Sequence, residues 1–339
     1  MAGRKKIALA VLVLLLLGSL IGGSWIWLRP APLRLLSLLP AGANLYLKAD
    51  LVGLRSNHAL ARLMARREEL PTSPAYRDFV EATGFRYQQH LRGIAAAKIG
   101  EDWVGAAQIV LDRSRTVNYL ESAGAEQYEL EGLTVYSYGN SRPVRLVFLD
   151  EERVAFSAGV DRTLLADLIS RYRGRSSGFL PPMSSTEAEQ VGPDAEQDGG
   201  ERTDDPHESE IWAFVDMERL VGQIPETPLF GPFSMGRDIL RGSRKLTLRV
   251  EASPLDLRAE IRNRVEDRES ADRLANGLRA ILVILRASVS ASERSEGREE
   301  GWNYGPVFAA VEIARRRESV IVRWQWNASM LGLLREPGQ

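Results

Sequence analysis

An uninterrupted apolar run near the start of the chain constrains its fold more than any other feature. Residues 7–28 contain no charged side chain, and Arg4, Lys5 and Lys6 precede them. At about 1.5 Å rise per residue, a helix of this length measures about 33 Å, enough to cross a hydrocarbon core of about 30 Å. The basic residues favour a cytoplasmic N-terminus. We therefore expect a basic tip at 1–6, a single-pass anchor in the inner membrane, and the bulk of the chain in the periplasm or outside.

A cleavable signal peptide is the alternative to an anchor. Residues 7–17 also fit the apolar region of a signal peptide, and Gly22 and Ser24 are small enough for a cleavage site. The run stays apolar through Trp25–Leu28, however, and tryptophan at that depth suits a membrane interface. The pattern favours the anchor, and it leaves cleavage open.

Composition limits both the core and the chemistry of the rest. The chain is 44% hydrophobic and 26% charged, which is enough apolar material for one large domain or two smaller ones. The sequence contains no cysteine. This excludes disulfides, thiolate metal sites, cysteine nucleophiles and a lipoprotein anchor.

The near-neutral net charge hides a strong asymmetry. Residues 184–210 carry ten acidic side chains and a single basic one, Arg202, so the segment has a net charge of −9 and the remainder of the chain one of +8. Such a segment buries too little apolar surface to offset its ordering entropy. We expect an acidic disordered linker at 184–209, and a second polar loop at 288–301.

Two pairs of similar segments recur at one offset, which predicts an internal duplication. Residues 44–54 match 210–220, and residues 152–165 match 318–331, each at a spacing of 166. Two separated matches at one offset favour duplication over chance. We therefore expect two ectodomain repeats, at 29–183 and 210–335.

The polar residues at the matched positions are expected to cap helices. Asp50 and Asp216 each end an apolar stretch and precede a helical pattern, and Asp161 and Asn327 share the corresponding place near the end of each half. Aspartate and asparagine are both good N-cap residues, because their side chains accept hydrogen bonds from free backbone N–H groups. A catalytic carboxylate would not retain its function as asparagine, so capping is the preferred interpretation.

Hydrophobic periodicity predicts an α+β fold, with the N-terminal transmembrane helix followed by two tandem, similar repeats of antiparallel sheet plus helix. In the first half we expect strands at 45–49, 94–99, 105–111, 128–138, 144–149 and 153–158, and helices at 57–70, 74–83, 116–123 and 162–172. In the second we expect strands at 211–215, 245–252, 256–262, 307–314 and 320–326, and a helix at 270–287. In the last strand, alternation puts Val320, Val322, Trp324 and Trp326 on one side, which we expect to be core.

The order of several segments resembles a group of uncharacterised bacterial membrane-anchored proteins, typical of acidobacteria and similar lineages. The segments are LLPAGANLYLKADL, ATGFRYQQHLRGIAAA, YELEGLTVYSYG, VRLVFLDEERVAFSAGVDRTLLADLI and SEIWAFVDMERL. The resemblance covers most of residues 37–334 outside the acidic segment. It implies one membrane segment and a duplicated α+β ectodomain of unknown function, and it supplies no site residues.

No motif for chemistry is evident. His58, His90 and His207 are scattered without metal-ligand spacing, and the chain lacks a nucleophile elbow, a Walker loop and a dinucleotide-binding glycine pattern. Arg315–Arg317 form a basic cluster at an expected turn between strands, without the interleaved aromatic residues of a nucleic-acid surface. The sequence therefore assigns no catalytic, cofactor-binding or metal-ligating residue, and it predicts neither a cofactor nor a nucleic-acid partner.

These observations favour a non-enzymatic binding, scaffold or accessory protein that is anchored in the membrane and acts outside the cytoplasm. Its partner would be an envelope protein or a membrane-associated ligand, and its oligomeric state stays open. The first alternative is an envelope hydrolase whose Asp and Glu residues are assembled by the fold, since carboxylate pairs from distant loops leave no motif. The second is electrostatic docking of the basic ectodomain on an anionic envelope surface.

Overall fold

The structure is a computed structural model that describes residues 35–58, 60–61, 74–175, 209–221, 240, 242–295 and 308–327. The chain divides into two compact units, Met1–Arg34 and Leu35–Gln339, and every described residue belongs to the second. The expected anchor at 7–28 and nearly all of the expected linker at 184–209 lie outside the described residues. In the described part of the chain, no helix is long and apolar enough to cross a membrane.

The N-terminal half joins seven strands through turns and short helices. Its elements are η1 (Leu35–Leu38), β1 (Leu45–Asp50), α2 (Leu51–Ser56), α4 (Pro74–Thr83), α5 (Tyr87–His90), β2 (Leu91–Ile99), β3 (Asp102–Ile109), α6 (Arg113–Ser122), β4 (Glu126–Leu130), β5 (Leu133–Tyr138), β6 (Val144–Phe148), β7 (Arg153–Ala158) and α7 (Thr163–Tyr172). The helix expected at 74–83 and the strand expected at 153–158 have the expected bounds. Both are bounded by polar or turn-forming residues, which fix their ends locally.

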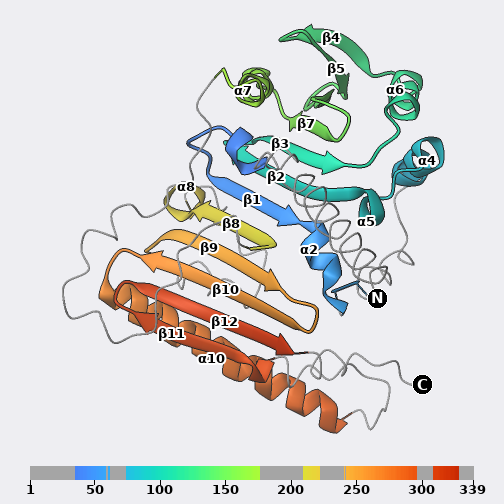
Figure 1. The fold of residues 1–339 in the computed structure, drawn as a ribbon. Coiled ribbons are helices and arrows are strands. Elements are labelled where there is room, and N and C mark those ends of the chain that lie inside the picture. The colour runs from blue at the N-terminus through green and yellow to red at the C-terminus, as the bar shows by residue number, and fades with distance from the viewer. Residues whose placement is uncertain are drawn as a thin grey trace, which may run out of the picture. The chain divides into compact units, whose positions relative to one another are not determined.

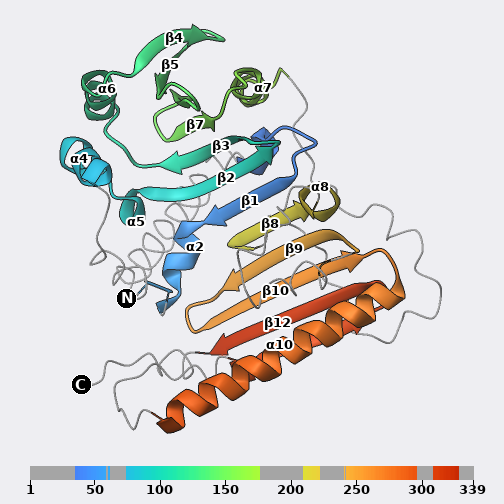
Figure 2. The same ribbon diagram turned by 180° about the vertical axis from the view of Figure 1, so that it is seen from behind.

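In its described part, the C-terminal half contributes five strands and two helices, a short one and a long one. Its elements are β8 (Ile211–Asp216), α8 (Met217–Val221), β9 (Ser243–Ala252), β10 (Asp256–Val265), α10 (Arg268–Ser295), β11 (Val311–Arg316) and β12 (Ser319–Asn327). Figure 2 shows α10 lying along β11 and β12 on one side of the strands. The helix follows β10 directly, so it packs back against the sheet that it leaves.

All of these strands belong to one antiparallel sheet of twelve strands, in the order β11-β12-β10-β9-β8-β1-β2-β3-β7-β6-β5-β4 (Figure 1). The described fold is therefore mostly β, with few helices. The predicted fold class, an α+β chain with an N-terminal transmembrane helix and two tandem sheet-plus-helix repeats, is wrong. The two halves do not form separate sheets, because β1 and β8 pair along their length, from Leu45 opposite Val215 to Ala49 opposite Ile211.

The prediction failed because the backbone groups at a strand edge need hydrogen-bond partners. Each half taken alone would leave β1 or β8 as an open edge, with a row of unpaired backbone N–H and C=O groups. Pairing the two edges satisfies both rows. Recurrence in the sequence indicates similar local structure in the two segments, but it carries no information on whether those segments pair with each other.

Strand register gives the sheet two sides of different character, which we name after the helices that lie on them. Tyr46, Ala97 and Val104 occupy facing positions on neighbouring strands of the side covered by α7, the α7 side. Ile313 and Val320 belong to the opposite side, the α10 side. Because successive residues of a strand point to opposite sides, these assignments fix the side of every other strand residue.

Apolar clusters cover both sides of the N-terminal half. On the α7 side, Leu165, Leu168 and Ile169 of α7 pack with η1 against the strands, and all three are fully buried. On the α10 side, residues of α6 and the segment before it pack against a second cluster that includes Tyr136 and Phe148. In the C-terminal half, the packed cluster lies under α10, where Leu274 and Ala275 meet the strands.

The edge strand β11 is closed by arginines of α10. Arg279 donates to the carbonyl oxygen of Ile313, and Arg286 donates to the carbonyl oxygens of Phe308, Ala309 and Val311, at 2.9–3.3 Å. These bonds supply donors to an edge that has no neighbouring strand. Capping an edge in this way opposes pairing with another chain.

Three local expectations need correction. The single strand expected at 128–138 is a hairpin, because Glu131 and Gly132 both take positive φ and turn the chain between β4 and β5. The polar loop expected at 288–301 is helical as far as Ser295, because α10 continues through it. The helix expected at 57–70 is described only at its start, where His58, Leu60 and Ala61 are helical, and it is preceded by the short helix α2, which was not expected and which Asp50 caps.

Candidate functional site: an arginine face on the sheet

Asp50 and Asp216, the two carboxylates singled out by the internal match, both serve backbone at strand ends. The Asp50 side chain accepts from the N–H groups of Val52 and Gly53 at 3.0 and 3.1 Å and so caps α2. Asp216 accepts from the N–H of Arg219 at 3.3 Å and pairs with its guanidinium at 3.4 Å. Antiparallel pairing puts the two aspartates at opposite ends of β1 and β8, about 20 Å apart along the strands. They cannot act together on one bond.

The second matched pair is described at one member only. Asp161 accepts from the backbone N–H and the hydroxyl of Thr163 at 2.8 and 2.7 Å, at the start of α7. These hydrogen bonds lower the pKa of Asp161, and its near-complete exposure gives burial little effect. The side chain of Asn327 lies outside the described residues, so its capping role stays a prediction.

The histidines remain apart from one another in the fold. His90 accepts from the backbone N–H of Arg86 through Nδ1 at 2.8 Å, His58 is exposed at the end of α2, and His207 lies outside the described residues. No group of three or more His, Asp or Glu side chains of the described residues could hold a metal ion.

One carboxylate, Asp150, has a dense set of partners, and they tie α7 to the β6–β7 turn. Its Oδ2 accepts from Tyr172 at 2.7 Å and pairs with Arg153 at 2.8 Å. Burial would raise the pKa of Asp150, but the Tyr172 and Glu152 hydrogen bonds and the Arg153 charge outweigh it and lower the pKa. A carboxylate held ionised by fixed partners suits a structural tie better than proton transfer.

The basic cluster Arg315–Arg317 and the tryptophans of the last strand both belong to the β11–β12 hairpin. Arg317 turns the chain between β11 and β12 with positive φ, and Arg315 pairs with Asp272 of α10 at 2.8 Å. Val320 is buried under α10 as expected, whereas Trp324 and Trp326 are half-buried and contact each other edge to face at 4.5 Å.

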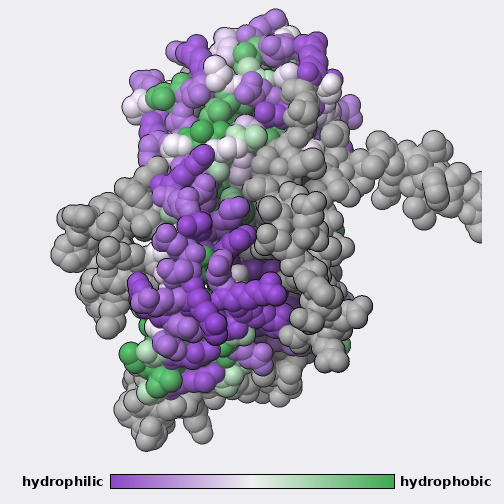
Figure 3. Space-filling model, turned by 90° about the vertical axis from the view of Figure 1, so that its left-hand side faces the viewer, coloured by the Kyte–Doolittle hydropathy of each residue, from purple (hydrophilic) through white to green (hydrophobic). Residues whose placement is uncertain are grey.

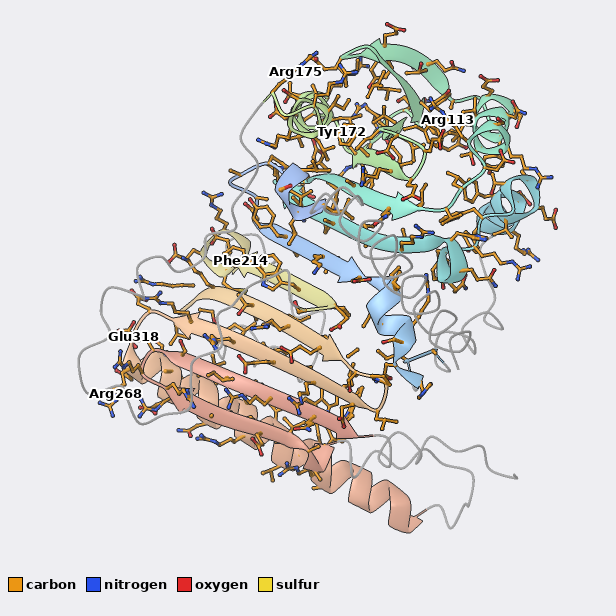
Figure 4. The ribbon with its side chains drawn as sticks, in the orientation of Figure 1. Arg113, Tyr172, Arg175, Phe214, Arg268 and Glu318 are labelled. Carbon is orange, nitrogen blue, oxygen red and sulfur yellow. The ribbon has the colours of Figure 1, made fainter. Side chains whose placement is uncertain are left out.

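The α7 side changes character between the two halves of the sheet. Next to β1, Trp212 and Phe214 of β8 are buried and stacked, and Phe214 is labelled in Figure 4 at this border. On β9, β10 and β12 the same side carries charged residues. We call this surface the arginine face; it consists of Lys245, Arg249, Glu251, Arg258, Glu260, Arg262, Arg264 and Arg323.

On β9, β10 and β12 the arginine face carries six basic side chains and two acidic ones. On the flanking strands, Asp216 stands opposite Lys245, and Glu312 opposite Arg323, on the same side of the sheet. Of the helices that the structure describes, α2 and α8 meet β9 near its two ends, and α10 lies on the opposite side. Figure 3 views the molecule from the left-hand side of Figure 1, where hydrophilic residues predominate among the described residues of the C-terminal half that face the viewer. The face is thus a predominantly basic sheet surface beside an apolar one, and its cations range from the buried Arg249 to the exposed Lys245 and Arg258.

Ion pairs divide the cations of the arginine face into two groups. Glu260 pairs with Arg323 at 2.9 Å and with Arg262 at 3.2 Å, and Glu251 pairs with Arg249 at 3.2 Å. Burial would raise the pKa of Glu260, but the Arg323 hydrogen bond and the charges of both arginines outweigh it and hold the pKa below its ordinary value of 4.5. Glu260 is therefore held as an anion by its two arginine partners.

The remaining cations carry the excess charge. Lys245 and Arg258 are exposed and make no ion pair with any described residue, and Lys245 stands directly opposite Arg264 on the neighbouring strand. Like charges at facing positions of an antiparallel pair are destabilising. Arginine forks are well shaped to hold carboxylate or phosphate groups.

Sequence reasoning missed this face, although a signal for it was present. In the β10 segment DLRAEIRNRV, charged residues fall at every second position, from Arg258 to Arg264. Alternation predicts that these residues share one side of a strand. It does not reveal that Lys245, Arg249 and Arg323 lie beside them, because that depends on the strand order.

The chain matches no protein-family model and no curated protein. Among solved structures it is similar to three crystal forms of TP0453. Crystal forms III, IV and I align with TM-scores of 0.49, 0.45 and 0.42 at 12%, 12% and 10% identity, covering 89%, 88% and 90% of this chain and 97%, 94% and 97% of that one. Likeness at this level carries no argument about function.

Proposed function

We propose that this chain is a non-enzymatic binding protein of the cell envelope, and that the arginine face is the surface with which it holds an acidic partner. In this proposal the apolar N-terminal segment keeps the chain at the inner membrane, with its bulk outside the cytoplasm. The protein would serve as a scaffold or accessory subunit for that partner.

One observation carries the proposal. A single side of a continuous sheet is a sealed apolar core over β1, β2, β3 and β7, and becomes an array rich in basic residues over β9, β10 and β12. An open antiparallel face needs to be polar, but it does not need an excess of one charge. Six cations against two anions favour an anionic occupant over simple solvation.

The hydrolase alternative gains no support from the described residues. Asp50 and Asp216 lie at opposite ends of their strands, and the pKa values of Asp150, Asp161 and Glu260 are lowered. A general acid needs a carboxyl whose pKa is raised.

The test is extraction of the full chain from its own membranes in mild detergent, followed by size analysis and mass spectrometry of what co-elutes. We expect a stoichiometric acidic protein with the natural chain. We expect the double variant Lys245→Glu/Arg258→Glu to lose it, because the variant reverses both exposed cations that have no ion pair among the described residues.

A matched control separates the site from general charge. The variant Arg77→Glu/Arg86→Glu changes the net charge by the same amount at exposed positions of the N-terminal half. It should retain the partner. Equal loss in both variants, or equal retention, would refute the role of the arginine face.

Electrostatic docking on an anionic bilayer has its own signature. A chain that docks in this way would elute without a protein partner and would bind nanodiscs of anionic lipid more tightly than neutral ones. Its binding would weaken as salt rises, because exposed charges are screened over about 8 Å at physiological ionic strength. That result would replace the protein partner with a lipid surface.

A further inference from the structure

The chain carries a polyanion of its own, which could serve as an occupant of the arginine face. Residues 184–210 have a net charge of −9, and the remainder of the chain has one of +8. Few acidic partners could match this basic surface at a higher local concentration. A tethered segment binds intramolecularly at an effective concentration in the millimolar range for a short flexible tether.

The last residues of the acidic segment are described, and they reach the sheet beside the arginine face. The carbonyl oxygen of Ser209 accepts from Lys48 Nζ at 2.8 Å, and Glu210 Oε2 accepts from the backbone N–H of Ala252 at 2.8 Å. Lys48 belongs to the α7 side, in register with Trp212 of β8 and, one strand further, Arg249. The acidic segment therefore ends at the border of the arginine face and on the same side of the sheet.

The first residues before the segment also belong to the α7 side. Helix α7, which packs on that side, ends at Tyr172, and the described chain stops three residues later at Arg175, which pairs with Glu131 at 2.9 Å. The 33 residues from 176 to 208 can span about 100 Å when extended, so reach does not limit them. The described residues on both flanks of the segment thus lie on the side of the sheet that bears the arginine face.

We infer that the acidic residues of 184–208 occupy the arginine face of their own chain, and that an external acidic partner must compete with them. This inference rests on the proposed function of that face. It makes the acidic segment an internal competitor that weakens binding until a partner with higher charge density displaces it. The favoured partner is accordingly an acidic protein segment of the same chemistry.

Lysine placement gives a direct test, because the chain contains only five lysines. Carbodiimide joins carboxylates to nearby amines without a spacer. Lys245 lies on the arginine face, whereas Lys98 lies on the α10 side of β2. In the full chain in mild detergent, we expect mass spectrometry to find links from Lys245 to acidic residues of 184–208, and few or none from Lys98.

The same experiment can overturn the inference. Equal linking at Lys98 and Lys245, or no link between Lys245 and 184–208, would refute it. Mixing isotope-labelled and unlabelled chains distinguishes one chain from two: links confined to single chains support the inference, and links mainly between chains overturn it. Lys48 is set aside, because it already bonds Ser209.

A binding measurement tests the competition. In one variant, all Asp and Glu residues of 184–208 are replaced by Asn and Gln, which keeps length and removes charge. We expect a fluorescent peptide of twelve alternating Glu and Ser residues to bind this variant at least about tenfold more tightly than the natural chain at low salt. Unchanged affinity would refute the competition.

The two proposals can fail separately. If the neutralised variant binds the peptide no better, yet Lys245→Glu/Arg258→Glu still loses the native partner, the internal competitor is wrong and the arginine face stands. If the peptide binds neither the natural chain nor the neutralised variant, and the native partner is indifferent to the arginine-face variant, both proposals are wrong.

Discussion

Glu260 pairs with two cations of the arginine face. Replacing it should lower the free energy of unfolding and raise the affinity for an acidic ligand. Its carboxylate joins Arg323 at 2.9 Å and Arg262 at 3.2 Å. The substitution Glu260→Gln keeps the size of the side chain and removes its charge. Two neighbouring guanidinium groups then face each other without an anion between them.

The structure sets the size of the effect. A hydrogen bond to a charged group contributes about 1.5–3 kcal/mol, whereas an exposed ion pair contributes about 0.2–1 kcal/mol. The Glu260 side chain is 25% exposed, and its partners Arg262 and Arg323 are 21% and 45% exposed, so this site lies between those limits. We expect Glu260→Gln to lower the free energy of unfolding by about 1–2 kcal/mol at pH 7.

The loss should depend on pH in a defined direction. Because its partners hold the pKa of folded Glu260 below the ordinary 4.5, the carboxylate stabilises the fold above about pH 4.5 and loses this contribution as pH falls through the folded pKa. Glu260→Gln and the natural chain should therefore differ at pH 7 and converge under acid conditions. The same variant should bind the acidic peptide more tightly, because the face gains one unit of positive charge.

Urea unfolding of the full chain in mild detergent, followed by tryptophan fluorescence, measures the difference. Trp324 follows Arg323 directly on β12, Trp326 lies two residues further along, and both report on this strand. Glu129→Gln on β4 is the control, since Glu129 is an exposed strand carboxylate that makes no ion pair with a described residue. A loss equal to that of the control at pH 7, or a loss that persists undiminished below the folded pKa, would contradict the reasoning.

Three further substitutions test the packing, the capping and the edge. Leu168→Ala in the fully buried face of α7 should cost about 3 kcal/mol of unfolding free energy in the same urea assay; Val160→Ala, at a position 70% exposed, should cost less than about 0.5 kcal/mol. Asp50→Ala should cost about 1 kcal/mol, because the first turn of α2 loses its cap. Arg286→Ala should leave carbonyl groups of the β11 edge bare and increase concentration-dependent self-association in analytical ultracentrifugation; an unchanged sedimentation profile would show that the edge is protected by other means.

The sequence predicts the positions of most strands and helices. The period-two patterns of β1, β7 and β9 and the helical pattern of α4 each contain their own signal, because alternation and polar boundaries act over a few residues. The turn at Glu131–Gly132 was missed, since apolar residues on both sides continue the strand pattern across it. The extension of α10 to Ser295 was missed because its last turns are polar, and propensity alone does not end a helix at a polar residue.

The arginine face is harder to predict from the sequence, because it is built from three strands and no single segment encodes their order. Alternation along β10 predicts that three of the arginines share one side, namely Arg258, Arg262 and Arg264. Arg323, in contrast, belongs to a strand that follows α10 and a further loop. The opposite error arose with Asp50 and Asp216. They are alike in sequence, yet antiparallel pairing sends them to opposite ends of the sheet.

The sequence by itself determined the elements, the sides on which strand residues stand, the capping role of Asp50, and the separation of charge into an acidic segment and a basic remainder. Each of these follows from interactions between residues close along the chain. Only the tertiary structure decided that β1 and β8 join both halves into one sheet, and that the cations of β9, β10 and β12 share one face of it. The reason is that strand pairing links residues far apart in sequence, where edge groups choose a partner by satisfying their hydrogen bonds and burying a shared side.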